Sequence, residues 1–229
     1  MSSVAGWLDA VVFDLDGTIV DTESPSFESW RRTWEQHGET LLLDEWVLCV
    51  GTDWDLFDPL AELGRRVPGL DLDSVRAGKR ELEATLVGVT VLREGVSAWL
   101  AEAAALDLPL AIASSSPRQW VDQHLERLGV AGSFVSVHTV TEVGVTKPDP
   151  ASYLAACTAL GVEPARSLAV EDSVNGTAAA RAAGMRVVAC PNPVTVGLDL
   201  STADLVLSTL EERTLTQVAE DLAHLTPKL

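Results

Sequence analysis

The chain of 229 residues contains few cysteines. Cys49, Cys157 and Cys190 are odd in number and far apart, and no Cys-x-x-Cys pair or Cys/His ligand spacing accompanies them. This spacing argues against a disulfide framework and against a structural zinc site. The simple interpretation is a protein of a reducing compartment, so we expect it in the cytoplasm.

Basic side chains are also scarce. Sixteen Lys and Arg stand against 34 Asp and Glu, which gives a formal net charge of −18. Nucleic acids and anionic membrane surfaces recruit basic patches, so we predict neither as a partner. A small anionic substrate is compatible with this charge only where a metal ion or a placed lysine supplies positive charge locally.

Long apolar runs are missing. The most apolar stretch, residues 99–113, is interrupted by Glu102 and Asp107, too early for a membrane span. Residues 1–10 (MSSVAGWLDA) lack a basic region followed by an apolar one, so no signal peptide is predicted. Hydrophobic residues nevertheless make up 47% of the chain. That fraction is typical of a globular protein, here one large domain or a domain with an insertion.

Strand-like and helix-like segments alternate through most of the sequence. Residues 8–14 (LDAVVFD) form a short β-branched run that predicts a buried strand. Residues 21–90 show helical spacing of apolar residues instead, and we interpret them as an inserted helical domain. From residue 91 onward, helical segments alternate with the strand-like segments LPLAIAS, FVSVHTV, SLAVED, RVVAC and ADLVLST. The pattern predicts an α/β fold with a doubly wound, mostly parallel sheet, its core formed by residues 1–20 and 91–229.

Groups suited to chemistry lie at the ends of four predicted strands. They are Asp14 and Asp16, Ser114, Lys147, and Glu171 with Asp172. The carboxyl ends of parallel strands meet at one edge of a sheet, so we expect these groups to gather there. Carboxylates without His or Cys nearby favour Mg²⁺ over zinc. Together with a lysine and a hydroxyl they describe a phosphate site, where positioning and charge neutralisation dominate catalysis.

The two aspartates of the first cluster can take different roles. One carboxylate can act as a covalent nucleophile. A second, two residues on and so on the same side of an extended chain, can donate a proton to the leaving oxygen. Gly17 allows a sharp turn directly afterwards. The competing interpretation of the segment Asp14–Gly17 is a plain strand-to-turn transition.

Four short motifs occur in a familiar order: DLDGT (14–18), ASSS (113–116), TKPDP (146–150) and VEDSVNG (170–176). With them the chain resembles the haloacid dehalogenase superfamily, and the insertion after the first motif resembles the cap of its phosphoglucomutase-like phosphatase branch. The resemblance implies a phosphatase that uses Mg²⁺, an aspartyl-phosphate intermediate and a small phosphorylated metabolite, with sugar or polyol phosphates as the expected substrates. We expect a monomer or a weak dimer.

The resemblance implies roles for the two aspartates of the first motif. Asp14 would be the phosphoryl-accepting nucleophile and a Mg²⁺ ligand. Asp16 would be the general acid/base, with its backbone carbonyl on the metal. In the dehalogenases of this superfamily the second position is not Asp, because a halide needs no proton. Asp16 therefore favours phosphate esters as substrates.

Roles for the other three motifs follow in the same way. Ser114 and the Ser115 N–H would hold phosphoryl oxygens, and Lys147 would link the nucleophile and the phosphate. Asp172 would bind Mg²⁺, with Glu171 as a further ligand or as an acceptor behind it. The structural alternatives are a solvated loop lysine and helix N-caps. Those N-caps would be Ser115 or Ser116 before Pro117, and Asp172 before the SVNG segment.

The cap sequence bears on the choice between phosphate hydrolysis and phosphomutase activity. The mutase branch carries a cap His and a cap Arg, and by offset Ser26 and Trp54 stand at those positions. Losing the Arg removes the group that would hold a distal phosphate, so hydrolysis is favoured. Four cap cations could replace that grip and keep a β-phosphoglucomutase-like mutase as the alternative: Arg31, Arg32, Lys79 and Arg80. The third functional hypothesis is a non-catalytic phosphate-binding module on this fold.

Tryptophans are numerous, seven in all. Trp30 and Trp34 are four residues apart on one helix face, which predicts cap core. Trp99 and Trp120 predict packing of helices on the sheet. Trp54 lies in VGTDW, where the resemblance places the substrate-specificity loop, so it either faces the leaving group or packs inside the cap.

Overall fold

A parallel sheet forms the centre of the molecule in the computed structural model, which describes residues 4–48 and 57–225. Its six strands run in the order β3-β2-β1-β4-β5-β6, and every neighbouring pair is parallel. The strands are β1 (Ala10–Phe13), β2 (Leu110–Ala113), β3 (Ser136–His138), β4 (Ser167–Glu171), β5 (Arg186–Ala189) and β6 (Leu205–Val206). The β-branched run predicted at residues 8–14 is therefore the central strand β1, with β2 on one side and β4 on the other.

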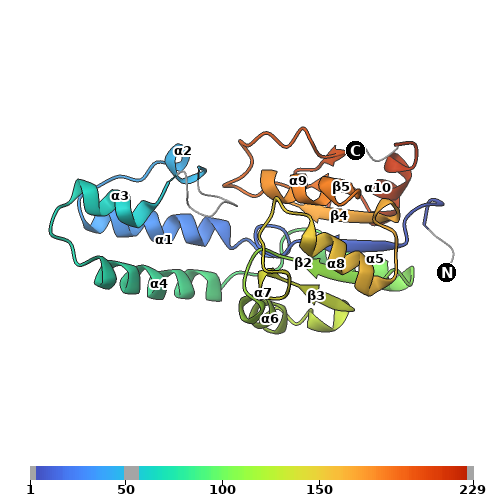
Figure 1. The fold of residues 1–229 in the computed structure, drawn as a ribbon, viewed down its shortest axis with the longest axis horizontal. Helices are drawn as coiled ribbons and strands as arrows, with labels where there is room; N and C mark the ends of the chain where they lie inside the picture. Colours follow the sequence, from blue (N-terminus) through green and yellow to red (C-terminus); the bar gives the residue numbers. More distant parts are fainter. Residues whose placement is uncertain (1–3, 49–56, 226–229) are drawn as a thin grey trace.

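Helices cover both faces of this sheet (Figure 1). Side chains of a strand alternate between faces, so Val11 and Phe13 join one apolar cluster while Val12 joins another. The first cluster includes side chains of α5 (Val96–Ala105), α6 (Arg118–Arg127) and α10 (Leu215–Leu222). The second includes side chains of α8 (Ala151–Leu160) and α9 (Val174–Ala182). The short elements are α7 (Val140–Val143) and two 3₁₀ turns, Ala131–Ser133 and Pro164–Arg166. The predicted doubly wound α/β fold is confirmed.

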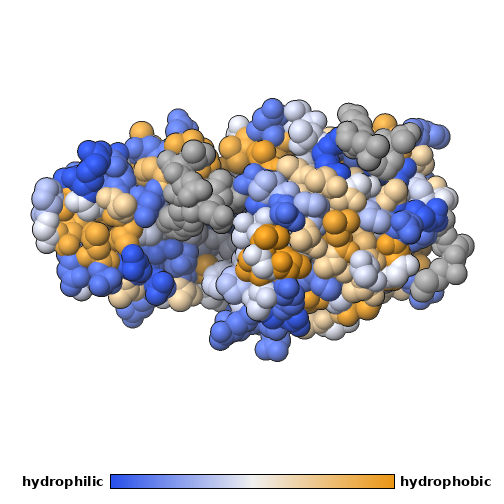
Figure 2. Space-filling model, in the orientation of Figure 1, coloured by the Kyte–Doolittle hydropathy of each residue, from blue (hydrophilic) through white to orange (hydrophobic). Residues whose placement is uncertain are grey.

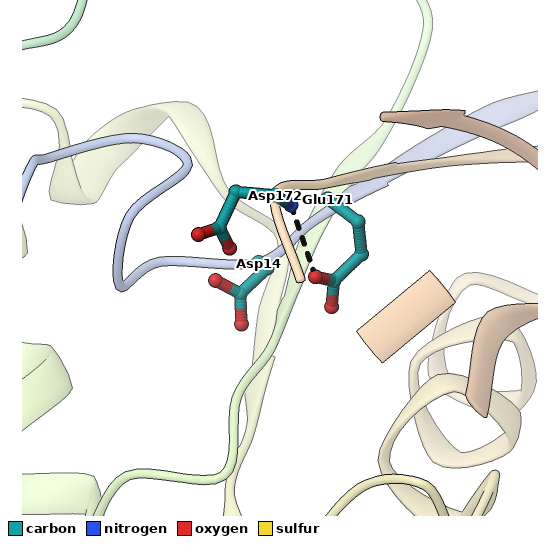
Figure 3. Close-up of side chains that lie close together, drawn as sticks. All are labelled: Asp14, Glu171 and Asp172. Atoms are coloured by element: carbon teal, nitrogen blue, oxygen red, sulfur yellow. Dashed lines mark hydrogen bonds between the residues drawn. The ribbon is translucent and has the colours of Figure 1, made fainter. Parts of the chain in front are cut away.

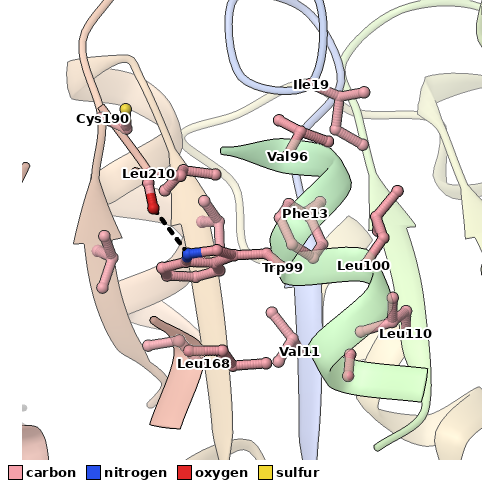
Figure 4. Packing of buried hydrophobic residues seen from close by; sticks show 14 of the residues in the cluster. Val11, Phe13, Ile19, Val96, Trp99, Leu100, Leu110, Leu168, Cys190 and Leu210 are labelled. Carbon is pink, nitrogen blue, oxygen red and sulfur yellow. Dashed lines mark hydrogen bonds between the residues drawn. The ribbon is translucent and has the colours of Figure 1, made fainter. Parts of the chain in front are cut away.

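Trp99 on α5 anchors the larger cluster (Figure 4). Its ring meets Phe13 edge-on, with 6.4 Å between the ring centroids. Its indole N–H donates to the carbonyl oxygens of Leu210 and Arg213, both at 2.9 Å. A buried indole that keeps a hydrogen-bond partner contributes apolar area without leaving a polar group unsatisfied. This packing fixes β1, whose carboxyl end carries Asp14.

A separate helical unit, residues 23–88, projects from the carboxyl edge of the sheet (Figure 1). It comprises α1 (Glu23–Gln36), α2 (Leu43–Trp46), α3 (Pro59–Arg66) and α4 (Leu72–Gly88). Helices α1 and α4 lie side by side, and the unit has its own apolar cluster that contains Trp30 and Trp34. The side chains of Asp58 and Asp71 cap α3 and α4 by accepting backbone N–H groups of the first turn. The two tryptophans thus pack where their spacing predicts.

The surface carries hydrophilic side chains over both parts of the molecule, with smaller apolar patches between them (Figure 2). Among the described residues, the helices are too short or too polar to cross a membrane.

Candidate functional site

The ends of β1 and β4 bring the first and fourth motifs together. Phe13 is paired with Val170 in the register of the two strands. The backbone N–H of Asp14 donates to the carbonyl of Val170 at 2.9 Å, which extends the ladder by one residue. Asp14 therefore lies beside Glu171, the last residue of β4, and next to Asp172. Adjacent parallel strands explain why residues over 150 positions apart meet here.

Lys147 lies between two of these carboxylates. Its Nζ is 2.5 Å from Asp14 Oδ1 and 2.6 Å from Glu171 Oε1, and all three side chains are buried. Burial alone would lower the pKa of Lys147, but the charges of the two carboxylates raise it above its ordinary value. The backbone N–H of Lys147 donates to Ser115 Oγ at 3.0 Å, which ties its loop to the end of β2. The lysine is a fixed cation and not a solvated loop residue.

Three buried carboxylates lie close together at this edge of the sheet (Figure 3). Asp14, Glu171 and Asp172 each offer an oxygen within 4.8 Å of the others. Burial raises the pKa of Asp14 and that of Asp172 well above the usual range, and neighbouring carboxylates raise both further. The excess negative charge and the all-oxygen donor set fit a hard divalent cation.

Glu171 differs from the two aspartates in its surroundings. In Figure 3 the carboxylates of Asp14 and Asp172 lie side by side, whereas that of Glu171 lies apart from them. Glu171 Oε1 accepts from Lys147 and from the Tyr153 hydroxyl, both at 2.6 Å. Its Oε2 accepts the backbone N–H of Asp172 at 3.1 Å. Both oxygens are therefore already engaged by protein donors.

Asp172 is oriented by residues from two other segments. Asn192 Nδ2 donates to Asp172 Oδ2 at 2.6 Å, and the Thr18 hydroxyl donates to Oδ1 at 3.3 Å. A Cβ at Gly17 would lie 2.3 Å from Asp172 Oδ2, and the φ of Gly17 is +79°, so only glycine fits both the turn and this approach. The N-cap of α9 is Ser173, whose hydroxyl accepts the N–H of Gly176. The alternative interpretation, in which Asp172 is the N-cap of this helix, is therefore wrong.

Asp16 accepts three hydrogen bonds. Its Oδ1 lies 2.9 Å from the Thr22 hydroxyl and 2.8 Å from the indole nitrogen of Trp120, and its Oδ2 lies 2.6 Å from the Ser116 hydroxyl. Trp120 does pack against the sheet cluster, as predicted, but its polar edge belongs to the site. No local pattern predicts that contact, because it joins residues 104 positions apart.

The serine motif follows β2. Ser114 is buried; its Oγ accepts the Ser116 N–H at 3.0 Å, and its own N–H donates to the carbonyl of His138 at 3.0 Å. The N-cap residue of α6 is Pro117, with no side-chain cap. The Ser115 hydroxyl instead accepts the backbone N–H of Lys147, and the Ser116 hydroxyl donates to Asp16. The alternative that either serine is the N-cap of α6 is therefore wrong. Trp54, the other predicted binding residue, lies outside the described residues.

Arg93 braces the same loops from the point where the chain returns from the helical unit. Its guanidinium donates to the carbonyls of Gly17, Cys190 and Pro191. The return segment also pairs with the outgoing one through the bridge Val20–Leu92. Neither Arg93 nor Asn192 was predicted. The only signal for Asn192 was its place just beyond the strand-like RVVAC segment, another carboxyl strand end.

The helical unit places charged groups near Asp16. The pKa of Glu23 is raised to about 8, mainly by burial and secondly by the charges of Asp16 and other carboxylates. Lys79 is buried on α4, with Nζ 2.7 Å from Glu83 Oε1 and 5.2 Å from the ring centroid of Trp30. The other cap cations considered above are solvent-accessible, and two of them pair with carboxylates of their own helix: Arg31 and Arg32.

Comparison with known proteins agrees with this geometry. A family model described as haloacid dehalogenase-like hydrolase matches residues 8–184. The chain is 38% identical over 218 residues to YhcW of Bacillus subtilis (strain 168), whose name describes it as an inferred phosphatase; the match covers 94% of this chain and 98% of YhcW. It is 30% identical to the validoxylamine A 7'-phosphate phosphatase of Streptomyces hygroscopicus subsp. limoneus, with 88% and 93% covered.

Two further similarities bear on the branch of the family. The chain is 28% identical to the β-phosphoglucomutase of Bacillus subtilis (strain 168), with 90% of this chain and 95% of the mutase covered. Among solved structures, a HAD family hydrolase from Deinococcus radiodurans R1 with bound phosphate and sodium superposes with a TM-score of 0.76 at 28% identity, covering 90% and 93%. The predicted superfamily and the prediction of a phosphatase enzyme are confirmed. The chain belongs to the haloacid dehalogenase-like hydrolase family.

Proposed function

We propose that the protein is a Mg²⁺-dependent phosphatase that hydrolyses small phosphate monoesters of the sugar or polyol type through an aspartyl-phosphate intermediate. The observation that carries this proposal is the buried pair of Asp14 and Lys147, 2.5 Å apart, with Asp172 beside Asp14 and Asp16 two residues on. A carboxylate held against a fixed ammonium group at the end of a buried strand is placed to attack, and the neighbouring carboxyl is placed to move a proton.

The metal site of this proposal uses residues of the first and fourth motifs. Asp14, Asp172 and the backbone carbonyl of Asp16 would hold Mg²⁺. Glu171 is better placed as the acceptor that orients Lys147, because its two oxygens already bind Lys147, Tyr153 and the N–H of Asp172. When bound, Mg²⁺ would neutralise charge on the phosphoryl oxygens.

The protein residues then divide the reaction between them. An oxygen of Asp14 bonds to phosphorus as the bond from phosphorus to the ester oxygen breaks. Asp16 gives its proton to that leaving oxygen and later takes one from the water that attacks the aspartyl phosphate, which releases inorganic phosphate and restores Asp14. Lys147 stabilises the negative charge through both steps, and Ser114 and the Ser115 N–H hold the phosphoryl oxygens.

The substrate class rests on the relatives. One is named validoxylamine A 7'-phosphate phosphatase and another β-phosphoglucomutase, and the matches cover 88% and 90% of this chain. We assign residues 21–90 as a cap whose closure excludes bulk water and selects small leaving groups.

Hydrolysis is a better match than phosphomutase activity. A mutase must hold a second phosphate, yet Ser26 and Trp54 stand where the grip is expected. Arg31 and Arg32 pair with glutamates on α1, and Lys79 pairs with Glu83. These cations are therefore already neutralised by neighbouring carboxylates.

A metabolite-phosphate panel tests this proposal. The purified chain is incubated with sugar and polyol monophosphates, including β-glucose 1-phosphate, in Mg²⁺ and in EDTA. We expect Mg²⁺-dependent release of inorganic phosphate that Asp14→Asn abolishes. Conversion of β-glucose 1-phosphate to its isomer with little phosphate release would show a mutase. Absence of Mg²⁺-dependent turnover on the panel and on 4-nitrophenyl phosphate, by folded protein, would contradict the enzyme assignment.

A further inference from the structure

Trp120 is the least expected neighbour of Asp16. It lies in the first turn of α6, and its indole N–H donates to Asp16 Oδ1 at 2.8 Å. We propose that Trp120 is a positioning residue for proton transfer by Asp16: it holds that carboxyl group in one orientation. The proposal rests on the phosphatase function and on Asp16 as its general acid.

The indole is held firmly enough to set a direction. Its ring packs against the larger sheet cluster and lies 4.2 Å, centroid to centroid, from the ring of His124 one turn further along α6. His124 Nδ1 is 2.8 Å from the carbonyl oxygen of Trp120, which links the two residues a second time. A ring with two rotatable torsions, packed against the cluster on one side and against a tilted imidazole on another, is a rigid donor.

The chemistry of the donors separates the two oxygens of Asp16. An indole N–H can only donate, whereas a hydroxyl can donate or accept. While the Trp120 contact is intact, Asp16 Oδ1 must remain an acceptor. The Ser116 hydroxyl, 2.6 Å from Oδ2, contacts the other oxygen, so the carboxyl group is held from both sides.

This orientation has a consequence for catalysis. A carboxyl group that rotates freely spends part of its time turned away from the leaving group. A carboxyl group held in one orientation presents its proton in one direction, and orientation of this kind contributes substantially to rate. Trp120 would thus act on the proton transfers of Asp16, and not on binding of the phosphoryl group by Ser114 and Lys147.

Leaving-group dependence tests this role, because 4-nitrophenolate departs as a stable anion and benzyl alcoholate does not. Trp120→Phe keeps the ring and removes the N–H. We expect its kcat/KM on benzyl phosphate to fall about tenfold or more, within the range general acids contribute, and its kcat/KM on 4-nitrophenyl phosphate to change less than about twofold. The ratio kcat/KM reports the steps through phosphoryl transfer to Asp14, so it excludes the later hydrolysis that both esters share.

Trp99→Phe is the matched control. It also removes an indole N–H, but one that donates to the carbonyls of Leu210 and Arg213 and not to Asp16, so it should lower the melting temperature and leave the ratio of the two rates unchanged. Equal losses on both esters in Trp120→Phe, or no loss on either, would overturn the positioning role.

Asp16→Asn separates failure of this inference from failure of the proposed function. If Asp16 is the acid, Asp16→Asn loses far more rate on benzyl phosphate than on 4-nitrophenyl phosphate, whatever Trp120→Phe does. An Asp16→Asn variant without that preference would contradict Asp16 as the acid, and the role of Trp120 would fall with it. Thermal melting of each variant confirms that the protein compared is folded.

Discussion

The ammonium group of Lys147 and the carboxylate of Asp14, 133 positions apart in the sequence, form a buried ion pair with 2.5 Å between Nζ and Oδ1. The same Nζ contacts Glu171, so one cation serves two carboxylates, and Asp172 adds a third close by. Removing charged groups from water is costly unless each has a partner. The cluster of three carboxylates is therefore only partly neutralised by Lys147.

Lys147→Met should destabilise the protein strongly. It leaves Asp14 and Glu171 without their shared cation, and breaking a buried pair from one side costs about 3–5 kcal/mol of unfolding free energy. Urea unfolding at pH 8 in EDTA measures it. Lys79→Met is the control, since Lys79 is also buried but has Glu83, a partly exposed partner, as its ion pair. Equal losses for the two variants would contradict the account of Lys147.

Gly17→Ala should damage both stability and metal binding. The new Cβ would lie 2.3 Å from Asp172 Oδ2 and must push that carboxylate aside, in addition to the strain of alanine at a φ of +79°. Gly38→Ala isolates the strain, because Gly38 has a φ of +77° with no atom within 4 Å of the added Cβ. We expect Gly38→Ala to cost about 1–2 kcal/mol and to bind Mg²⁺ normally by calorimetry. Gly17→Ala should cost more and bind it weakly. Normal Mg²⁺ affinity in Gly17→Ala would show that Asp172 is not a ligand.

Glu23 should make the protein less stable as the pH rises. Its pKa is about 8 in the folded state, above the ordinary value of 4.5, mainly because of burial. Between those values the folded state holds the proton that the unfolded state has released, so the unfolding free energy falls with rising pH and levels off above pH 8. Glu23→Gln removes this dependence. Its stability advantage over the wild type should therefore grow from pH 5 to pH 8, measured by urea unfolding in EDTA.

Glu28 provides the control for that measurement. Its ion pairs with Arg31 and Arg32 lower its pKa to about 2, so it titrates below the tested window. The difference between Glu28→Gln and the wild type should be flat from pH 5 to pH 8. A flat difference for Glu23→Gln as well would contradict the raised pKa.

Much of the site was predictable because its motifs are local. Asp14 and Asp172 each follow a buried strand directly, and adjacent strands in a parallel sheet bring such residues together whatever the rest of the chain does. The α/β fold followed from the same alternation of strands and helices. Segment boundaries were less accurate: the predicted strand at residues 8–14 is regular only from Ala10 to Phe13.

Contacts between distant side chains were not predictable in this way. Trp120, for which packing of a helix on the sheet was predicted, turns its polar edge to Asp16, and no local pattern distinguishes the two uses of an indole. Asn192 and Arg93 act on Asp172 and the Gly17 carbonyl through loops whose course depends on the assembled sheet. Predicting them requires the tertiary structure, because no short-range pattern encodes the contact.

The central claim is that Asp14 carries the phosphoryl group during turnover, and trapping that group tests it most directly. The enzyme is mixed with 4-nitrophenyl phosphate and Mg²⁺, quenched in acid within the first turnovers, and its peptides are analysed by mass spectrometry. The account predicts a phosphoryl group on Asp14 in the wild type and none in Asp14→Asn. Full turnover with Asp14 unmodified, or with the phosphoryl group on another residue, would contradict it.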